Sequence, residues 1–153
     1  MSLFLTKYFP HKVVTMSKCV LVMGGYGFLG SHLCRSLLSD GYRVRVLGRH
    51  GSSTLLIKDI LDKIEVVEAD IGDANAVLFA MKNVDVVIHA VHTTVPGSSM
   101  LDPAYDVISN VSSPVVWIAR LNETSVQKII YISSGGTVYG LPHSGLIYES
   151  HET

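Results

Sequence analysis

The chain has 153 residues, of which 48% are hydrophobic and 16% are charged, and this length and composition suit one globular domain with a sizeable core. Its formal net charge of −1 provides no electrostatic attraction for nucleic acid or for an anionic membrane surface, so we expect neither partner. No apolar run approaches the roughly 18 residues that are needed to span a bilayer.

The first part of the chain alternates between strand-type and helix-type segments. Residues 19–24 form a continuous apolar run, which is typical of a strand that is covered on both faces. Leucines repeat with helical spacing over residues 29–37, and the Asp-Gly pair at 40–41 ends this predicted helix. Residues 42–48 predict the second strand.

The alternation continues through the middle of the chain. Residues 55–64 predict a short helix, and residues 64–70 predict a third strand. Asp73 is placed to cap the next predicted helix, 74–82. Residues 84–92 are again apolar on both faces and predict the fourth strand.

The last regular segments are a long helix and a strand. Residues 101–122 predict the helix, with Pro103 in its first turn and Pro114 as a source of a kink. Residues 127–134 predict the fifth strand, and residues 135–153 predict a loop. Strands that are joined by helical crossovers indicate an α/β protein with a Rossmann-type doubly wound parallel sheet of about five strands.

Four glycines lie between the first predicted strand and the first predicted helix, in the stretch MGGYGFLG. In this context a glycine-rich loop predicts a dinucleotide site, and a loop that is rich in glycine only for packing is the alternative. Gly24 would permit a tight turn, Gly27 would let the backbone approach a pyrophosphate, and Gly30 would let the helix pack closely on the sheet. Two spacings fit the motif, because either Gly24 or Gly25 can be its first glycine.

The loop GGYGFLGSHL is followed in order by EADIGD, DVVIHAV, NV and YISSGGTVYG. Together these motifs, spread over residues 18–149, resemble the extended short-chain dehydrogenase/reductases. This is the family of NAD-dependent epimerases and dehydratases that act on nucleotide sugars, and the UDP-glucose 4-epimerase-like proteins are the most similar members. The resemblance implies hydride transfer between a sugar and a nicotinamide cofactor.

The resemblance also implies a cofactor site. Backbone amides near Phe28 and Leu29 would hold the pyrophosphate, and Asp70 would accept a hydrogen bond from the exocyclic amine of adenine. Asn110 would brace the helix beside the active site. A loop cap is the alternative role for Asp70, and an ordinary polar helix position is the alternative for Asn110. The other implied cofactor-binding positions are Ile71 beside the adenine, Ala90, Val91 and His92 along the nicotinamide ribose, and Ser133.

The end of the second predicted strand bears on the choice of cofactor. NAD-specific sites place a carboxylate there to bind both ribose hydroxyls, but this position is Gly48 and the next residue is Arg49. A guanidinium suits a 2′-phosphate, so Arg49 is a further cofactor-binding candidate. The cofactor is therefore NAD or NADP, and Arg49 favours NADP unless it merely faces solvent.

Catalysis in the family needs a Tyr as acid/base, a Lys four residues later, and a Ser or Thr that binds the substrate hydroxyl. No Y-x-x-x-K pair follows residue 140, where the family has it, because Tyr148 is followed at that spacing by Glu152 and the last lysine is Lys128. The position that matches the family's hydroxyl residue is Gly135, so the preceding Ser134 is the candidate for this role. The alternative role for Ser134 and for Ser133 is to form hydrogen bonds with backbone groups at the end of the strand.

The histidines and cysteines predict no separate site. His89 falls within the fourth predicted strand and is expected to be packed in the sheet. His92, His143 and His151 lack metal-ligand spacing, so we expect no metal. Cys19 and Cys34 fall in apolar segments, which indicates buried, reduced thiols in a cytoplasmic protein.

We interpret residues 16–153 as an incomplete dinucleotide-binding domain that stops before the substrate lobe. It would be the amino-terminal piece of a longer enzyme or the product of a truncated reading frame, and residues 1–15, before Met16, would be an extension or a mis-called start. Such a domain binds NAD(P) but is inactive alone, and a nucleotide sugar would bind only a full-length form. A regulatory module that senses a dinucleotide is the alternative. A homodimer through the helix at 101–122 is also expected.

Overall fold

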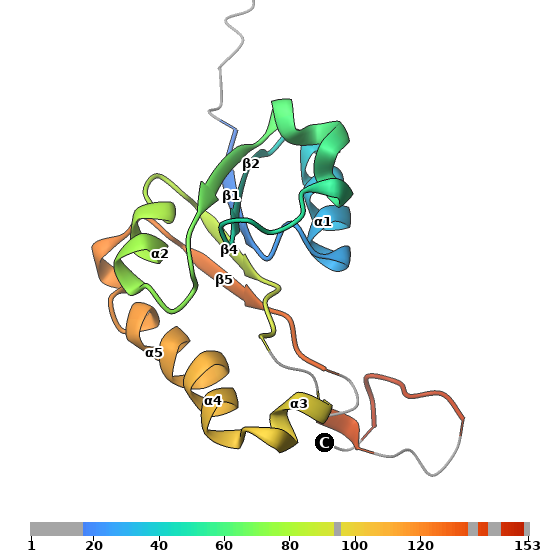
Figure 1. The fold of residues 1–153 in the computed structure, drawn as a ribbon. Helices are drawn as coiled ribbons and strands as arrows, with labels where there is room; N and C mark the ends of the chain where they lie inside the picture. Colours follow the sequence, from blue (N-terminus) through green and yellow to red (C-terminus); the bar gives the residue numbers. More distant parts are fainter. Residues whose placement is uncertain (1–16, 94–95, 135–137, 141–144, 152–153) are drawn as a thin grey trace, which may run out of the picture.

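Five parallel strands form the sheet of the computed structural model, which describes residues 17–93, 96–134, 138–140 and 145–151. The strand order is β3-β2-β1-β4-β5, as Figure 1 shows. The strands are β1 (Cys19–Met23), β2 (Arg43–Gly48), β3 (Glu65–Glu68), β4 (Val86–His89) and β5 (Lys128–Tyr131). The predicted α/β, Rossmann-type parallel sheet is confirmed, although β3, β4 and β5 are shorter than predicted.

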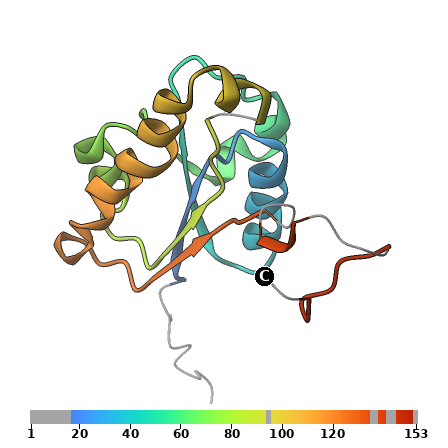
Figure 2. The ribbon, with the colours of Figure 1, turned by 90° about the horizontal axis from the view of Figure 1, so that it is seen from below.

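Helices cover both faces of the sheet. Figure 2 shows α1 on one side, with α2, α4 and α5 on the other. The helices are α1 (Phe28–Ser39), α2 (Ala74–Ala80), α3 (Pro96–Leu101), α4 (Pro103–Val107) and α5 (Ser113–Ile118). Shorter helical segments are the 3-10 helices η1 (Leu55–Lys63) and η3 (Leu121–Glu123) and the π-helical η2 (Ile108–Ser112).

The central strand β1 is buried along its whole length and divides the core into two clusters. Val20 and Val22 face the cluster beneath α1, whereas Leu21 and Met23 face the cluster that contains Trp117 of α5. This alternation follows from the two-residue repeat of a strand, in which successive side chains point to opposite faces. It also explains why this segment is apolar throughout, since neither face meets water.

Helix α1 largely follows the prediction. Leu33 and Leu37 of the predicted apolar stripe pack against the core, but the prediction is wrong for Leu29, which is 45% exposed. The helix ends at Asp40, and Gly41 adopts a left-handed φ of +83°, which a glycine accommodates without strain.

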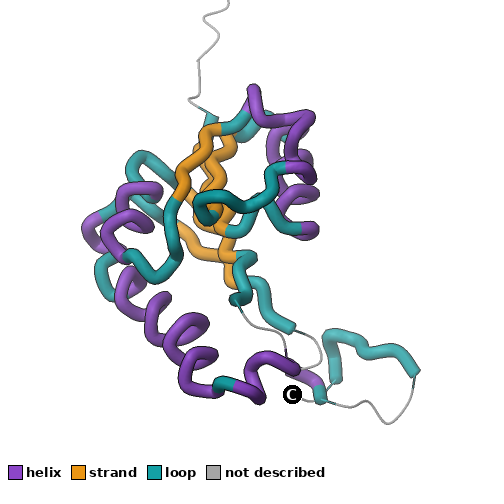
Figure 3. Tube along the Cα trace, in the orientation of Figure 1, coloured by secondary structure: helices purple, strands orange, loops and turns teal. Residues whose placement is uncertain are grey.

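The prediction of one long helix over residues 101–122 is wrong in its bounds and in its regularity. Asp102 caps α4 by accepting a hydrogen bond from the Tyr105 amide at 2.9 Å, so the helix begins at Pro103 and not at 101. Figure 3 shows α4, η2 and α5 as one continuous rod, but its middle is π-helical and it ends at Ile118. Pro114 supplies the reason, because a proline has no amide hydrogen and its ring clashes with the carbonyl four residues earlier. A wider π turn relieves both problems.

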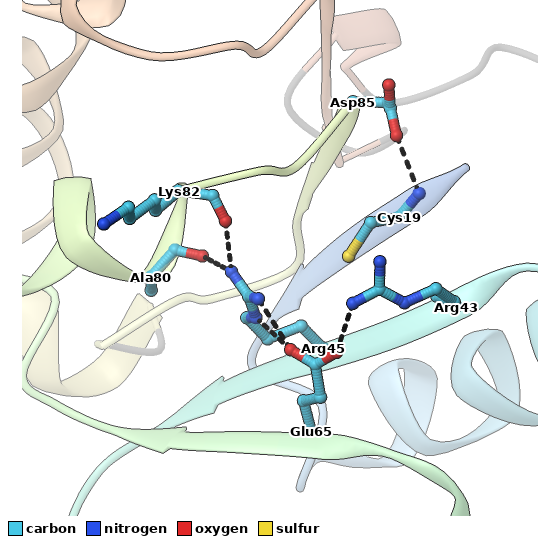
Figure 4. A network of polar contacts seen from close by, with 7 residues as sticks. All are labelled: Cys19, Arg43, Arg45, Glu65, Ala80, Lys82 and Asp85. Carbon is cyan, nitrogen blue, oxygen red and sulfur yellow. Dashed lines mark hydrogen bonds and ion pairs between the residues drawn. The ribbon is translucent and has the colours of Figure 1, made fainter. Parts of the chain in front are cut away.

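A network of charged side chains joins the amino ends of the strands (Figure 4). Arg45 binds Glu65 at 2.6 Å and also donates 2.7 Å hydrogen bonds to the carbonyl oxygens of Ala80 and Lys82. Arg43 binds the other carboxylate oxygen of Glu65 at 2.6 Å. The network therefore fixes the edge strand β3 and the end of α2 to β2, at the end of the sheet opposite to the glycine loop.

Candidate functional site

A cavity of about 500 Å³ lies at the carboxyl ends of the strands. Its lining comes from the glycine loop after β1, the ends of β2 and β3, the segment after β4, and one face of α4 and η2. In an open parallel sheet, ligands bind at this edge, where the strand order reverses, which here is between β1 and β4. The predicted residues that line it are Gly24, Gly27, Arg49, Asp70, Ile71, Ala90, Val91 and His92.

The glycine loop is shaped by close backbone contacts. Gly24 has a φ of +83°, and a Cβ there would lie 2.8 Å from the carbonyl oxygen of Ala90. A Cβ on Gly30 would lie 2.7 Å from the Cα of Gly25, so α1 could not approach the loop as it does. The tight turn therefore belongs to Gly24, which favours the G-x-x-G-x-x-G spacing. Gly25 meets a separate need, because a Cβ there would lie 2.6 Å from the Val46 side chain.

Helix α1 points its amino terminus at this loop. Gly27 is the N-cap residue, and no side chain of the described part of the chain caps it. The amides of the first turn, which include Phe28 and Leu29, are therefore open to an anion and carry the partial positive charge of the helix end. The side chain of Phe28 is 75% exposed, and neither residue lines the cavity.

Asn110 joins the segment after β4 to the π-helical turn. Its Oδ1 accepts hydrogen bonds from the amide of Thr93 at 3.1 Å and from the Thr93 hydroxyl at 3.0 Å. Its Nδ2 donates to Asp106 at 2.8 Å, and the Thr93 hydroxyl also donates to Ser109 at 2.7 Å. Asn110 does not line the cavity, but it holds Thr93, which does.

Asp70 and Ile71 lie after β3, on the cavity wall. Oδ1 of Asp70 accepts a hydrogen bond from the Gly72 amide at 2.8 Å, so the loop-capping role is present in the structure. The predicted cap at Asp73 is also found, where the side chain accepts hydrogen bonds from the amides of Asn75 and Ala76.

The end of β2 presents a cation and no carboxylate to the cavity. Gly48 is the last residue of β2, and the exposed Arg49 follows it on the cavity wall. The Arg49 guanidinium forms no ion pair or hydrogen bond with any residue that the structure describes. The nearby His50 is paired with Glu68 at 2.6 Å, which leaves Arg49 as the uncommitted positive charge.

Ser133 and Ser134 follow β5 and are both exposed. Neither lines the cavity, and the neighbouring Gly135 lies outside the described residues. The structure thus brings neither serine to this cavity. Their proposed roles stay predictions.

His89 is packed in the sheet, as expected. It is 2% exposed and stacks between the rings of Trp117 and Tyr131, with centroid distances of 6.0 and 4.5 Å. Burial lowers the pKa of the His89 imidazole to about 4, so the ring is neutral at pH 7. Cys19 and Cys34 are buried and unpaired, and burial raises the pKa of both thiols.

Sequence reasoning missed the helical wall of the cavity. Tyr105, Ser109 and Ser113 line it together with Ile108. The spacing of four residues from 105 to 109 to 113 is a helical repeat, and this signal could have placed the three side chains on one face. Tyr26 was also missed, although it lies within the glycine loop and lines the cavity.

The described residues contain neither a metal-binding cluster nor a membrane-spanning helix. No group of three or more His, Cys, Asp or Glu side chains is arranged to hold a metal ion. None of the helices there is long and apolar enough to cross a membrane.

Comparison with known proteins identifies the family. Residues 20–153 match the NAD dependent epimerase/dehydratase family. The putative UDP-glucose 4-epimerase of Methanocaldococcus jannaschii is 34% identical over 133 residues, which cover 86% of this chain and 43% of that protein. The UDP-glucose 4-epimerase of Bacillus subtilis is 34% identical over 137 residues, which cover 85% of this chain and 40% of that protein.

Solved structures agree with this assignment. The UDP-glucose 4-epimerase of Bifidobacterium longum, solved in complex with NAD⁺ and UDP, has a TM-score of 0.76 at 33% identity. The match covers 89% of this chain and 42% of that one. The enzyme of Stenotrophomonas maltophila, solved with NAD and formylated UDP-arabinopyranose, has a TM-score of 0.77 at 29% identity and similar coverage. The chain spans about two fifths of the length of these relatives, and it belongs to the NAD-dependent epimerase/dehydratase family.

Proposed function

We propose that this chain binds NAD or NADP as the cofactor region of a nucleotide-sugar epimerase or dehydratase. The observation that carries the proposal is the cavity of about 500 Å³, which lies between the glycine loop and the segment after β4. The uncapped end of α1 offers amides and positive charge beside it. The match to epimerases over residues 20–153 favours this function over that of a module that only senses a dinucleotide.

The residues suggest one orientation of the cofactor. The pyrophosphate meets the amides of Phe28 and Leu29 at the start of α1. The adenine lies toward Asp70 and Ile71, and the nicotinamide ribose lies along the segment that Asn110 braces. That segment contains Ala90, Val91 and His92.

The proposed cofactor preference is for NADP. Arg49 extends from the end of β2 without a partner among the described residues, so it is available to a 2′-phosphate. A charged hydrogen bond of this kind contributes about 1.5–3 kcal/mol, which corresponds to a factor of about ten to a hundred in affinity.

The reaction itself needs groups that this sequence does not contain. Hydride transfer from a sugar requires a base for the hydroxyl proton, and after residue 140, where the family has its catalytic pair, no tyrosine is followed by a lysine at that spacing. We propose that the chain holds the cofactor without turning over a sugar. Ser134 would act on a substrate hydroxyl only in a longer form that also binds the nucleotide sugar.

The proposal also includes a homodimer. Val107, Val111 and Val115 lie along the α4–η2–α5 rod and are each more than half exposed. A row of exposed valines on one helical rod is an apolar surface that a second copy could cover.

Calorimetric titration of the purified chain with NAD and with NADP tests the cofactor proposal. We expect both to bind, NADP at least about tenfold more tightly. Arg49→Gln should remove that difference and leave NAD affinity unchanged. Lys58→Gln, which removes the same charge from an exposed position on η1, should behave as the wild type. A wild-type chain that binds neither dinucleotide would refute the proposed function.

A further inference from the structure

Tyr26 occupies an unusual position within the glycine loop. It is 8% exposed and lines the cavity, and its ring lies across Gly48, the last residue of β2. A Cβ on Gly48 would lie 2.9 Å from Cζ of the ring and closer still to two neighbouring ring carbons. Real Cβ atoms essentially never come that close to another heavy atom, so the ring and a side chain at position 48 exclude each other.

The Tyr26 ring is also held in place by its packing against apolar side chains. It packs in the apolar cluster that includes Val46, Ile57 and Ile60. The backbone of the loop is fixed too, because Gly25 lies directly against Val46. The ring could leave Gly48 only by disrupting this cluster, and the interiors of proteins resist such displacement.

In a dinucleotide site, the residues at the end of β2 bind the adenosine ribose and discriminate NAD from NADP. A carboxylate there accepts hydrogen bonds from the 2′-hydroxyl, and it would repel a 2′-phosphate. In this chain the Tyr26 ring fills the space through which such a side chain would leave Gly48. The charged group that follows is the Arg49 guanidinium, on the cavity wall.

We propose that Tyr26 is a specificity-determining residue, whose ring bars an acidic side chain from the end of β2 and thereby reserves the adenosine ribose for Arg49. This inference rests on the proposed binding of a dinucleotide. The ring, and not the hydroxyl, performs the role. The hydroxyl oxygen is buried and has no hydrogen-bond partner among the described residues.

The contact can be tested without any ligand, by thermal unfolding. Gly48→Ala should lower the melting temperature by about 4 °C or more, because the added methyl group overpacks the ring. The same substitution should cost as much in a Tyr26→Phe background, where the ring remains, and clearly less in a Tyr26→Val background, where it is gone. Equal costs in all three backgrounds would overturn the inference.

Selectivity is tested by calorimetric titration of four chains with NAD and NADP. Tyr26→Phe should keep the wild-type ratio of affinities within about twofold, since it keeps the ring. Gly48→Asp alone should weaken the binding of both dinucleotides, because the loop must shift to admit the side chain. Adding Tyr26→Val to Gly48→Asp should restore NAD binding and weaken NADP binding by about tenfold or more relative to the wild type.

The outcomes separate the two proposals. If Gly48→Asp alone prefers NAD and melts like the wild type, Tyr26 does not exclude the acid and the inference is wrong, although dinucleotide binding stands. If the wild-type chain binds neither dinucleotide, the proposed function fails and the selectivity role fails with it.

Discussion

His89 shows how one residue can make the fold sensitive to acid. Its imidazole is buried between two aromatic rings, and both ring nitrogens lack hydrogen-bond partners among the described residues. Protonation would place a charge in this apolar surrounding, and burial is the main reason why the pKa is lowered to about 4. The ordinary pKa of 6.5 applies in the unfolded chain.

The free energy of unfolding should therefore fall as the pH falls from about 6.5 to 4. In this window the unfolded chain binds a proton at His89 that the folded chain does not, so the slope is up to about 1.4 kcal/mol per pH unit. His89→Phe should remove this part of the pH dependence. Urea denaturation at several pH values measures it, with His50→Phe as a control at an exposed histidine. Identical slopes for His89→Phe and the wild type would contradict the assignment.

At the residue scale, the sequence predicts what local backbone geometry demands. The need for glycine at position 24 follows from a turn within its own segment, and such a turn leaves a sequence signal. The contact between Tyr26 and Gly48 leaves none, because it exists only after β1 pairs with β2 and brings two distant segments together. A sequence pattern therefore located the glycine loop but could not reveal the contact of its tyrosine with Gly48.

At the element scale, Arg45 joins three parts of the fold. Its side chain is only 13% exposed, and it satisfies Glu65 of β3 and two carbonyl oxygens at the end of α2. Arg43 shares Glu65 but is 49% exposed and makes a single contact in the network. Together the two arginines hold the pKa of Glu65 below its ordinary value, so their contribution to stability is present at neutral pH and lost as acid protonates Glu65.

Arg45→Met should lower the free energy of unfolding by about 1–3 kcal/mol, because the carbonyl oxygens of Ala80 and Lys82 and one carboxylate oxygen of Glu65 lose their hydrogen-bond donor. Arg43→Met is the matched control, and it should cost less than about 1 kcal/mol, as exposed ion pairs do. Urea denaturation at neutral pH compares the two variants. Equal costs would show that the contacts of Arg45 with α2 contribute nothing measurable.

The elements themselves were predictable to different degrees. The five strands were found because each one carries an apolar run, but β4 was predicted over 84–92 and spans only Val86–His89. A strand ends where the neighbouring strands stop pairing with it, so its own sequence does not determine its last residue. The π turn before Pro114 is a different case. The proline predicted an irregularity in the helix, but whether it would be a kink or a π turn depended on how the helix packs.

At the scale of the whole molecule, the rod of α4, η2 and α5 presents two different faces. Trp117 and Pro114 are buried toward the sheet, where Trp117 fills the core cluster beneath β1. The valines at 107, 111 and 115 face away from that core and are 53%, 55% and 57% exposed. A helix that has apolar residues on both faces is typical of one that is covered on both.

We therefore expect the chain to self-associate through this surface. A stable pairing typically buries about 800 Å² per partner, and apolar contact at its centre supplies most of the free energy. Val111→Glu places a charge in the middle of the row and should leave a monomer at all concentrations, because burying an unpaired carboxylate is costly. Its dinucleotide affinity should match that of the wild type, since Val111 does not line the cavity.

Sedimentation velocity over a hundredfold range of concentration measures the outcome. The wild type should shift from monomer to dimer, and Leu55→Glu, which adds the same charge at an exposed leucine of η1, should shift with it. A wild type that stays monomeric, or a Val111→Glu variant that still dimerises, would show that this row is not the contact surface. The first result would also mean that the apolar row is tolerated in water, as scattered exposed side chains commonly are.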